Sequence, residues 1–144
     1  MKIACSVPIL TLNARPGLER LLPLLIAAFD DVFIVDGNST DGTREYAASL
    51  GARVENQFSH GEMDAPIQDF AATREHSWSL AKHDWVCYFD ADEYPSESLI
   101  QAIGEIVQQN DTRQLHEFIR VACLPSGEVV KHAFFYPEYC LRLF

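Results

Sequence analysis

Two aspartates separated by one residue are the side chains in this sequence that point most directly to chemistry. Asp90 and Asp92 follow the apolar run Trp85–Phe89, so they stand where a buried strand is expected to end. In extended geometry residues i and i+2 face the same side, and two carboxylates so close repel unless a cation intervenes. Carboxylate oxygens suit Mg²⁺ or Mn²⁺, which accept substrate phosphates as further ligands. The alternative is a pair of turn acids before a capped helix.

Two more polar clusters follow predicted strands. Thr11 and Asn13 stand where the apolar run 3–12 ends, and Asp36 opens the turn-rich stretch 36–43 after another run. The Asp36 carboxylate is placed to accept hydrogen bonds from a base or a ribose, with a local Asx turn as the alternative. Arg74, on the helix before the acidic strand, is either a phosphate contact or a solvated surface residue.

The elements that must position these clusters alternate between strand and helix. Pro23 is expected to kink or shorten the first helix, and Thr40 or Asp41 to cap the second. The predicted strands are 3–12, 32–35, 52–55 and 85–89, and the predicted helices are 16–29, 41–51, 67–82 and 96–109. This alternation predicts an α/β fold with a mostly parallel sheet flanked by helices. Ligands of such sheets bind beyond the carboxyl ends of the strands, where all three clusters fall.

The last part of the chain carries a hairpin signal. The runs 115–124 and 128–135 flank Pro125-Ser126-Gly127, so a C-terminal β hairpin is expected. The whole chain, residues 1–144, fits a single domain. Because it stops inside an apolar, strand-like segment, we expect a domain truncated at its C-terminal end.

Charge and composition exclude several classes of partner. The formal net charge of −10 and the lack of a basic stripe argue against nucleic acids as partners. Neither a phosphate-binding loop nor a dinucleotide fingerprint is present, so bound phosphates would need a metal ion. No apolar run is long enough to span a bilayer. The four cysteines form no C-x-x-C pair and predict free thiols, buried at Cys5, Cys87 and Cys123, in a cytoplasmic protein.

Four segments together resemble family-2 glycosyltransferases of the GT-A fold. They are Ser6–Asn13, Val32–Thr43, Asp84–Glu93 and Tyr136–Phe144. The last is similar to a stretch of bacterial enzymes that glycosylate lipopolysaccharide cores. The resemblance covers nearly the whole chain, and the four segments in order are more specific than any one of them.

The resemblance implies a role for each matching position. Asp92 matches the metal ligand of the D-x-D motif, and Asp90 matches its first acid, which contacts ribose or metal. The nucleotide-sugar-binding positions are Thr11, Asn13, Asp36, Asn38, Arg74 and Asp90. Glu138 and Glu93 are the only nearby acids to nominate as the general base. Two departures from the family pattern, Ala14-Arg15 and Glu75, bear on nucleotide contacts and donor preference.

The implied activity is an inverting transfer that uses Mg²⁺ or Mn²⁺. A sugar would pass from a nucleotide-diphosphate sugar to a hydroxyl of a glycan or lipid-linked acceptor, in the cytoplasm or at the inner face of the membrane. One rival is a catalytically inactive module that binds a sugar nucleotide. Another is a phosphatase or phosphotransferase in which the first Asp of D-x-D is the nucleophile, although that motif normally opens its domain. The oligomeric state and the identity of the sugar are not encoded in any recognisable pattern.

Overall fold

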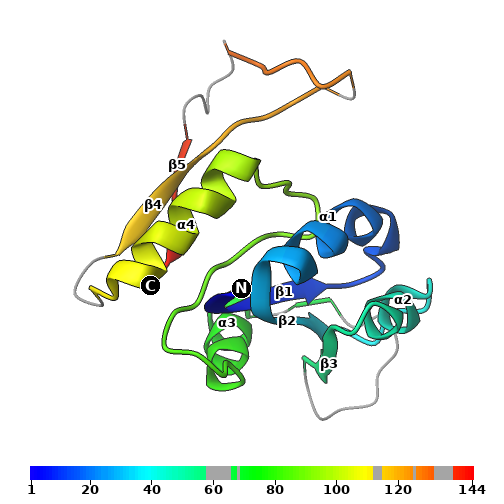
Figure 1. Cartoon of the computed structure of the whole chain (residues 1–144). Helices are drawn as coiled ribbons and strands as arrows, with labels where there is room; N and C mark the ends of the chain where they lie inside the picture. The colour runs from blue at the N-terminus through cyan, green and yellow to red at the C-terminus, as the bar shows by residue number, and fades with distance from the viewer. Residues whose placement is uncertain (58–65, 68, 112–114, 125, 132–137) are drawn as a thin grey trace.

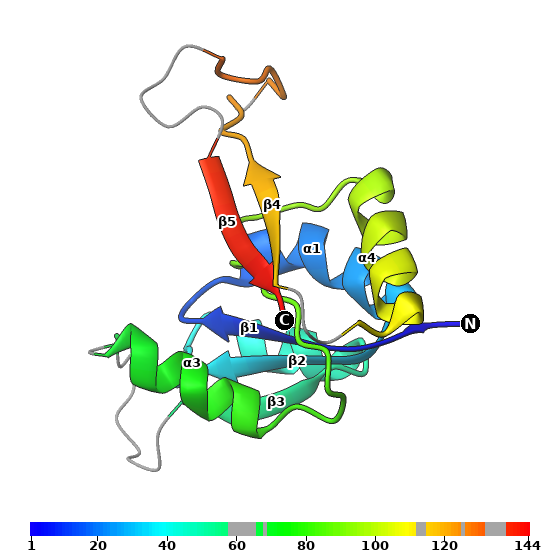
Figure 2. The ribbon, with the colours of Figure 1, turned by 90° about the vertical axis from the view of Figure 1, so that its left-hand side faces the viewer.

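A parallel three-stranded sheet forms the centre of the molecule. The computed structural model describes residues 1–57, 66–67, 69–111, 115–124, 126–131 and 138–144. In this sheet β1 (Ile3–Thr11), β2 (Phe29–Asp36) and β3 (Arg53–Asn56) lie in that order, and both pairings are parallel. β4 (His116–Arg120) and β5 (Glu138–Leu143) form an antiparallel pair, here called the β4–β5 ribbon. Figure 2 shows the ribbon standing steeply across the β1 side of the central sheet.

Helices cover both faces of the central sheet. α1 (Arg15–Ala28), α2 (Thr43–Ser49) and α4 (Glu97–Gln109) contribute to the core on one face, and α3 (Phe70–Ser79) lies on the other (Figure 1). Alternate residues of β1 meet one stripe of α1 in this core: Cys5, Val7 and Ile9 with Leu18, Leu21, Leu22 and Leu25. The period of two in the strand and of three to four in the helix produces this match.

The predicted strand at 85–89 is reduced to isolated bridges between the two sheets. One bridge is parallel to β1 and another antiparallel to β5, so we call residues 85–89 the bridging segment. The Ser6 N–H donates to the Trp85 carbonyl, and the Ser6 carbonyl accepts from Cys87, each at 2.9 Å. The next N–H of β1 on this side would belong to Pro8, which has none. The parallel ladder therefore stops after one residue pair.

Pro23 was expected to kink or shorten α1, but the helix is not shortened. The helix continues through it to Ala28, and Pro23 lies on the exposed side. A proline leaves the carbonyl four residues earlier without its helical donor, which here is that of Glu19. The Tyr46 hydroxyl of α2 donates to this carbonyl at 3.5 Å. The contact between α1 and α2 thus replaces part of what the proline removes.

The helix ends agree with the sequence in two cases and differ in a third. Ser96 caps α4 by accepting from the Leu99 N–H at 3.2 Å, and Gly51 follows α2 with φ 88°, both as predicted. The predicted caps of α2 were Thr40 or Asp41, but its N-cap residue is Gly42. Asp41 still accepts from the first helical N–H, that of Thr43, at 2.9 Å.

The predicted helix 67–82 is present as α3, Phe70–Ser79, and it buries small hydroxyl side chains rather than large apolar ones. Phe70 and Trp78 are exposed, whereas Thr73 and Ser77 are fully buried. The Ser77 hydroxyl contacts the Tyr88 hydroxyl beneath the helix and also donates to the Arg74 carbonyl of α3 itself, and the Thr73 hydroxyl donates to the Asp69 carbonyl. A hydrogen-bonded surface accepts small hydroxyl side chains better than large apolar ones.

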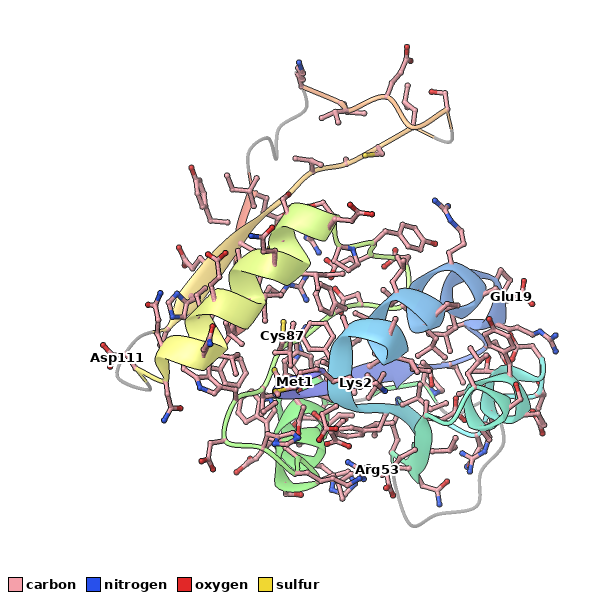
Figure 3. All side chains as sticks on the ribbon, viewed as in Figure 1. Met1, Lys2, Glu19, Arg53, Cys87 and Asp111 are labelled. Carbon is pink, nitrogen blue, oxygen red and sulfur yellow. The ribbon has the colours of Figure 1, made fainter. Side chains whose placement is uncertain are left out.

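The C-terminal hairpin is present, but its long pairing differs from the prediction. Cys123 bridges Val129 near the predicted turn. Beyond it β4 pairs with β5 rather than with 128–135, of which 132–135 lie outside the described residues. Cys5 and Cys87 are buried free thiols, as predicted, and burial raises the pKa of Cys5 to about 12. Cys87 lies in the interior in Figure 3, whereas Cys123 is exposed, so that prediction was wrong.

Candidate active site

The polar clusters named from the sequence gather at one edge of the sheet. β1 runs parallel to β2, and the bridging segment runs parallel to β1 where they meet, so their carboxyl ends point the same way. Thr11 and Asp36 end two of these strands and pair directly in the register. The acidic turn that begins at Asp90 follows the bridging segment. Figure 2 shows the parallel arrows of β1, β2 and β3 that define this edge.

The loops after β1 and β2 are tied together by hydrogen bonds. The Asn13 N–H donates to the Ser39 hydroxyl, and the Asn13 side chain accepts from the Thr40 N–H, each at 2.8 Å. The next two N–H groups, of residues 14 and 15, donate to Thr43 and Asp41. Asn13 and Asn38 adopt left-handed φ values of 49° and 64°, which asparagine tolerates. The two predicted asparagines therefore shape the edge of the sheet.

The Asp36 carboxylate is buried and its acceptor positions are filled. Oδ1 accepts from the Ser39 N–H at 2.8 Å and from Arg44 at 3.2 Å. Oδ2 accepts from the hydroxyls of Thr11 at 2.7 Å and Ser39 at 2.6 Å. A carboxylate has about four lone-pair sites. Asp36 thus joins β1, β2 and α2, and any ligand contact to it has to replace one of these donors.

Asp90 and Asp92 lie in a turn, not on an extended strand as the spacing argument assumed. The Glu93 N–H donates to the Asp90 carbonyl at 3.0 Å, and the Glu93 carboxylate accepts from the Asp90 N–H at 3.0 Å. This turn packs against the start of α1. A Cβ built on Gly17 would stand 2.3 Å from the Ala91 carbonyl oxygen, so only glycine allows this approach.

Two arginines of the β4–β5 ribbon neutralise part of the acidic turn. Arg142 donates to Glu93 at 2.5 Å and to Asp90 at 3.3 Å. Arg120 donates to Glu138 at 2.8 Å and to Glu93 at 3.3 Å. The hydrogen bond to Glu138 is the main reason why the pKa of Arg120 is raised. Burial alone would lower the pKa of Arg142, but the charges of Glu93 and Asp90 raise it. Both nominated bases, Glu93 and Glu138, are therefore held by guanidinium groups.

The acids fit a divalent cation in donor type and in charge. Asp92 is exposed and makes no ion pair with the described residues, and Asp90 shares only Oδ2 with the arginines. Among the described residues no three His, Cys, Asp or Glu side chains come together as a complete metal cage. Mg²⁺ is typically held by one or two carboxylates together with substrate phosphates, so a full cage is not required.

The third side of the edge is formed by α3 and the end of β3. Arg74 is exposed on α3, with its guanidinium carbon 5.6 Å from the centre of the Tyr88 ring. His76 of the same helix lies 3.3 Å from the Asn56 carbonyl. Gln57, the residue after β3, donates its N–H to the Asp36 carbonyl at 3.0 Å. Arg74 thus stays accessible, as a contact to an anion requires.

Several side chains that build the site had no assigned role at the level of sequence. Ser39 and Arg44 hold Asp36, and Arg120 and Arg142 hold the acidic turn. Arg142 lies in the last of the four family-like segments, so a signal existed for it. Gly17 follows Pro16 at the start of α1, but only the fold reveals what it approaches.

Comparison with known proteins identifies the family. The sequence profile described as glycosyl transferase family 2 matches residues 6–132. The chain belongs to this family. An uncharacterized glycosyltransferase from Rickettsia bellii is 29% identical over 140 residues, which cover 96% of this chain and 45% of that protein. This family-2 chain thus spans less than half the length of the curated relatives it matches.

Solved structures show the same fold. Mannosyl-3-phosphoglycerate synthase from Rubrobacter xylanophilus is 24% identical, with a TM-score of 0.55 over 75% of this chain and 37% of that one. A mannosyltransferase from Pyrobaculum calidifontis, in complex with GDP-Man and Mn²⁺, is 18% identical, with a TM-score of 0.56 over 86% of this chain and 36% of that one. The predicted GT-A α/β fold of this family-2 chain is confirmed. In the part of the chain that the structure describes, no helix is both long and apolar enough to cross a membrane.

Proposed function

We propose that this chain, as one domain, is the donor-binding part of an inverting, metal-dependent glycosyltransferase. The donor is a nucleotide-diphosphate sugar, and the acceptor is a hydroxyl of a glycan or lipid-linked sugar at the cytoplasmic face of a membrane. One observation carries the proposal: the loops after β1, β2 and the bridging segment meet at one edge of the sheet. Family membership and a neighbour that holds GDP-Man and Mn²⁺ support it.

Each cluster then has a part in binding the donor. Asp36 and Asn38, with Thr11 and Asn13, line the nucleotide end of the site, and Arg74 attracts the diphosphate. Asp90 and Asp92 hold Mg²⁺ or Mn²⁺, which supplies positive charge next to the leaving diphosphate. Arg142 keeps Asp90 and Glu93 in place without removing the negative charge that the ion needs. The four carboxylates in and beside this turn outnumber its two arginines, which leaves a net charge of about −2.

The transfer itself moves one bond and one proton. The acceptor oxygen attacks the anomeric carbon as the bond from that carbon to the diphosphate oxygen breaks, and the nucleoside diphosphate leaves. A general base takes the proton of the acceptor hydroxyl. Glu138 is the better nominee of the two, because its carboxylate is 37% exposed whereas that of Glu93 is 18% exposed. Either one would first have to release an arginine.

That requirement favours a second candidate, a module that binds the donor without transferring it. Neither nominated base is free of a guanidinium partner. Incubation with a radiolabelled sugar nucleotide, Mn²⁺ and glycan acceptors separates the two candidates. Donor binding together with labelled glycan supports the transferase, whereas donor binding without transfer or hydrolysis supports the module.

The metal assignment is tested by Asp92→Ala. We expect calorimetric titration with GDP-mannose or UDP-glucose to show tighter binding in Mn²⁺ than in EDTA for the natural chain. The variant should lose this difference and keep its melting temperature, because the Asp92 side chain is exposed. Asp84→Ala, an exposed acid at the other end of the bridging segment, is the matched control. Unchanged Mn²⁺ dependence in Asp92→Ala would refute the assignment.

A further inference from the structure

Gln57 carries the only buried side-chain polar atoms without a hydrogen bond among the described residues. Both its amide nitrogen and its amide oxygen lack a partner, and the residue is only 3% exposed. Buried amide groups are almost always paired, because an unmade hydrogen bond leaves their loss of solvation uncompensated. An exception of this kind calls for a partner that the described residues do not provide.

The position of Gln57 indicates what that partner is. Its backbone N–H donates to the Asp36 carbonyl, so it continues β3 alongside β2 at the carboxyl edge of the sheet. Ligands of open α/β sheets bind beyond this edge. The Asp36 carboxylate, the residue expected to recognise the base, already accepts four hydrogen bonds. Of Asp36 and Gln57, it is Gln57 whose side chain has an unpaired hydrogen-bond donor and acceptor.

We propose that the side-chain amide of Gln57 recognises the nucleobase of the donor through a paired donor and acceptor contact. This inference rests on the proposed function and adds the group that reads the base. A primary amide presents N–H and C=O side by side, and each nucleobase has an edge where a donor and an acceptor are adjacent. The amide gains both hydrogen bonds when the base binds, and it selects against a ligand that has no base.

The test compares Gln57→Met with Gln109→Met in this chain. Methionine keeps the length and volume of glutamine but removes its amide, and Gln109 lies exposed at the end of α4. Titration with UDP, GDP, ADP and CDP in Mn²⁺ measures base-dependent binding, and inorganic pyrophosphate in Mn²⁺ measures binding of the diphosphate alone. Thermal unfolding without ligand reports the cost of the unpaired amide.

We expect the natural chain to prefer one nucleoside diphosphate. Gln57→Met should weaken that binding about tenfold or more, leave pyrophosphate binding unchanged, and raise the melting temperature of the ligand-free chain. Gln109→Met should match the natural chain in all three. Unchanged nucleotide affinity in Gln57→Met, an equal loss for pyrophosphate, or a lower melting temperature would overturn the inference and leave the proposed function standing. If the natural chain binds none of the four diphosphates, the proposed function fails and this inference with it.

Discussion

The contact between Gly17 and the acidic turn supports a prediction in which two effects of one methyl group oppose each other. Replacing a helical glycine by alanine stabilises a helix by up to about 1 kcal/mol. In Gly17→Ala, however, the new Cβ would stand 2.3 Å from the Ala91 carbonyl oxygen. Carbon and oxygen atoms in such contacts settle at about 3.3–3.6 Å, so the backbone of the turn or of α1 must move by roughly 1 Å.

The steric term outweighs the helical gain. Overpacking of this kind costs about 1–3 kcal/mol, so a net destabilisation of about 1–2 kcal/mol is expected for Gly17→Ala. In a chain of this size that corresponds to a melting temperature lower by about 3–8 °C. Because Ala91 lies between Asp90 and Asp92, the same shift misplaces both carboxylates. Affinity for a sugar nucleotide in Mn²⁺ should therefore fall by more than the stability loss explains.

Gly104→Ala is the matched control. This glycine lies within α4, and its added Cβ would meet only the Ile3 side chain, at 3.4 Å. The helical gain should then be realised, with a slightly higher melting temperature and unchanged ligand binding. Differential scanning calorimetry and titration of both variants complete the comparison. If Gly17→Ala is as stable and binds as tightly as Gly104→Ala, the turn is not seated on α1 and the reasoning is refuted.

Two further predictions concern buried charges. Arg142→Met should cost about 1–3 kcal/mol of unfolding free energy, because it removes the shorter of the two guanidinium contacts to the largely buried Glu93 and leaves that of Arg120 at 3.3 Å. Arg120→Met, at a 42% exposed side chain, should cost less, and equal losses in urea unfolding would contradict this. Burial alone would raise the pKa of Asp31, but hydrogen bonds, chiefly from arginine, hold it below its ordinary value of 3.8. The contribution of the ionised Asp31 to the stability of the fold is therefore complete above about pH 4 and is lost as the pH falls further. Asp31→Asn should have a lower free energy of unfolding than the natural chain at pH 7, and the difference between the two should be smaller at pH 3. Asp30→Asn, with a 59% exposed side chain, should show little gap at either pH, and a gap for Asp31→Asn that does not change with pH would count against this account.

The sequence was most informative where local chemistry decides the structure. Ser96 and the apolar spacing behind it define α4 to within a residue, because a side-chain cap fixes where a helix begins. The gathering of polar clusters at one edge also followed from alternation alone, since parallel strands carry their carboxyl ends together. Gly51 was also predictable from local chemistry, because glycine readily adopts the left-handed conformation that commonly follows the end of a helix.

What the sequence could not supply were contacts between distant residues. The effect of Pro8 on the bridging segment depends on which neighbour β1 acquires on its second side. The burial of Ser77 depends on a hydroxyl of Tyr88 beneath the helix. Likewise, the two arginines that hold Glu93 lie on β4 and β5, far from Glu93 in the sequence. No spacing rule connects such positions, because each pairing is made by the fold.

The bridging segment has a consequence for how this polypeptide is made. Its N–H groups at Val86 and Tyr88 donate to the carbonyls of Phe144 and Arg142, at 2.8 Å each. Until residues 142–144 have been synthesised, the mostly aromatic and aliphatic run 85–89 has unpaired backbone N–H groups along one edge. Unpaired strand edges of this kind promote aggregation between nascent chains. Rapid arrival of β5, or a chaperone that shields residues 85–89 until then, is the safeguard that this topology demands.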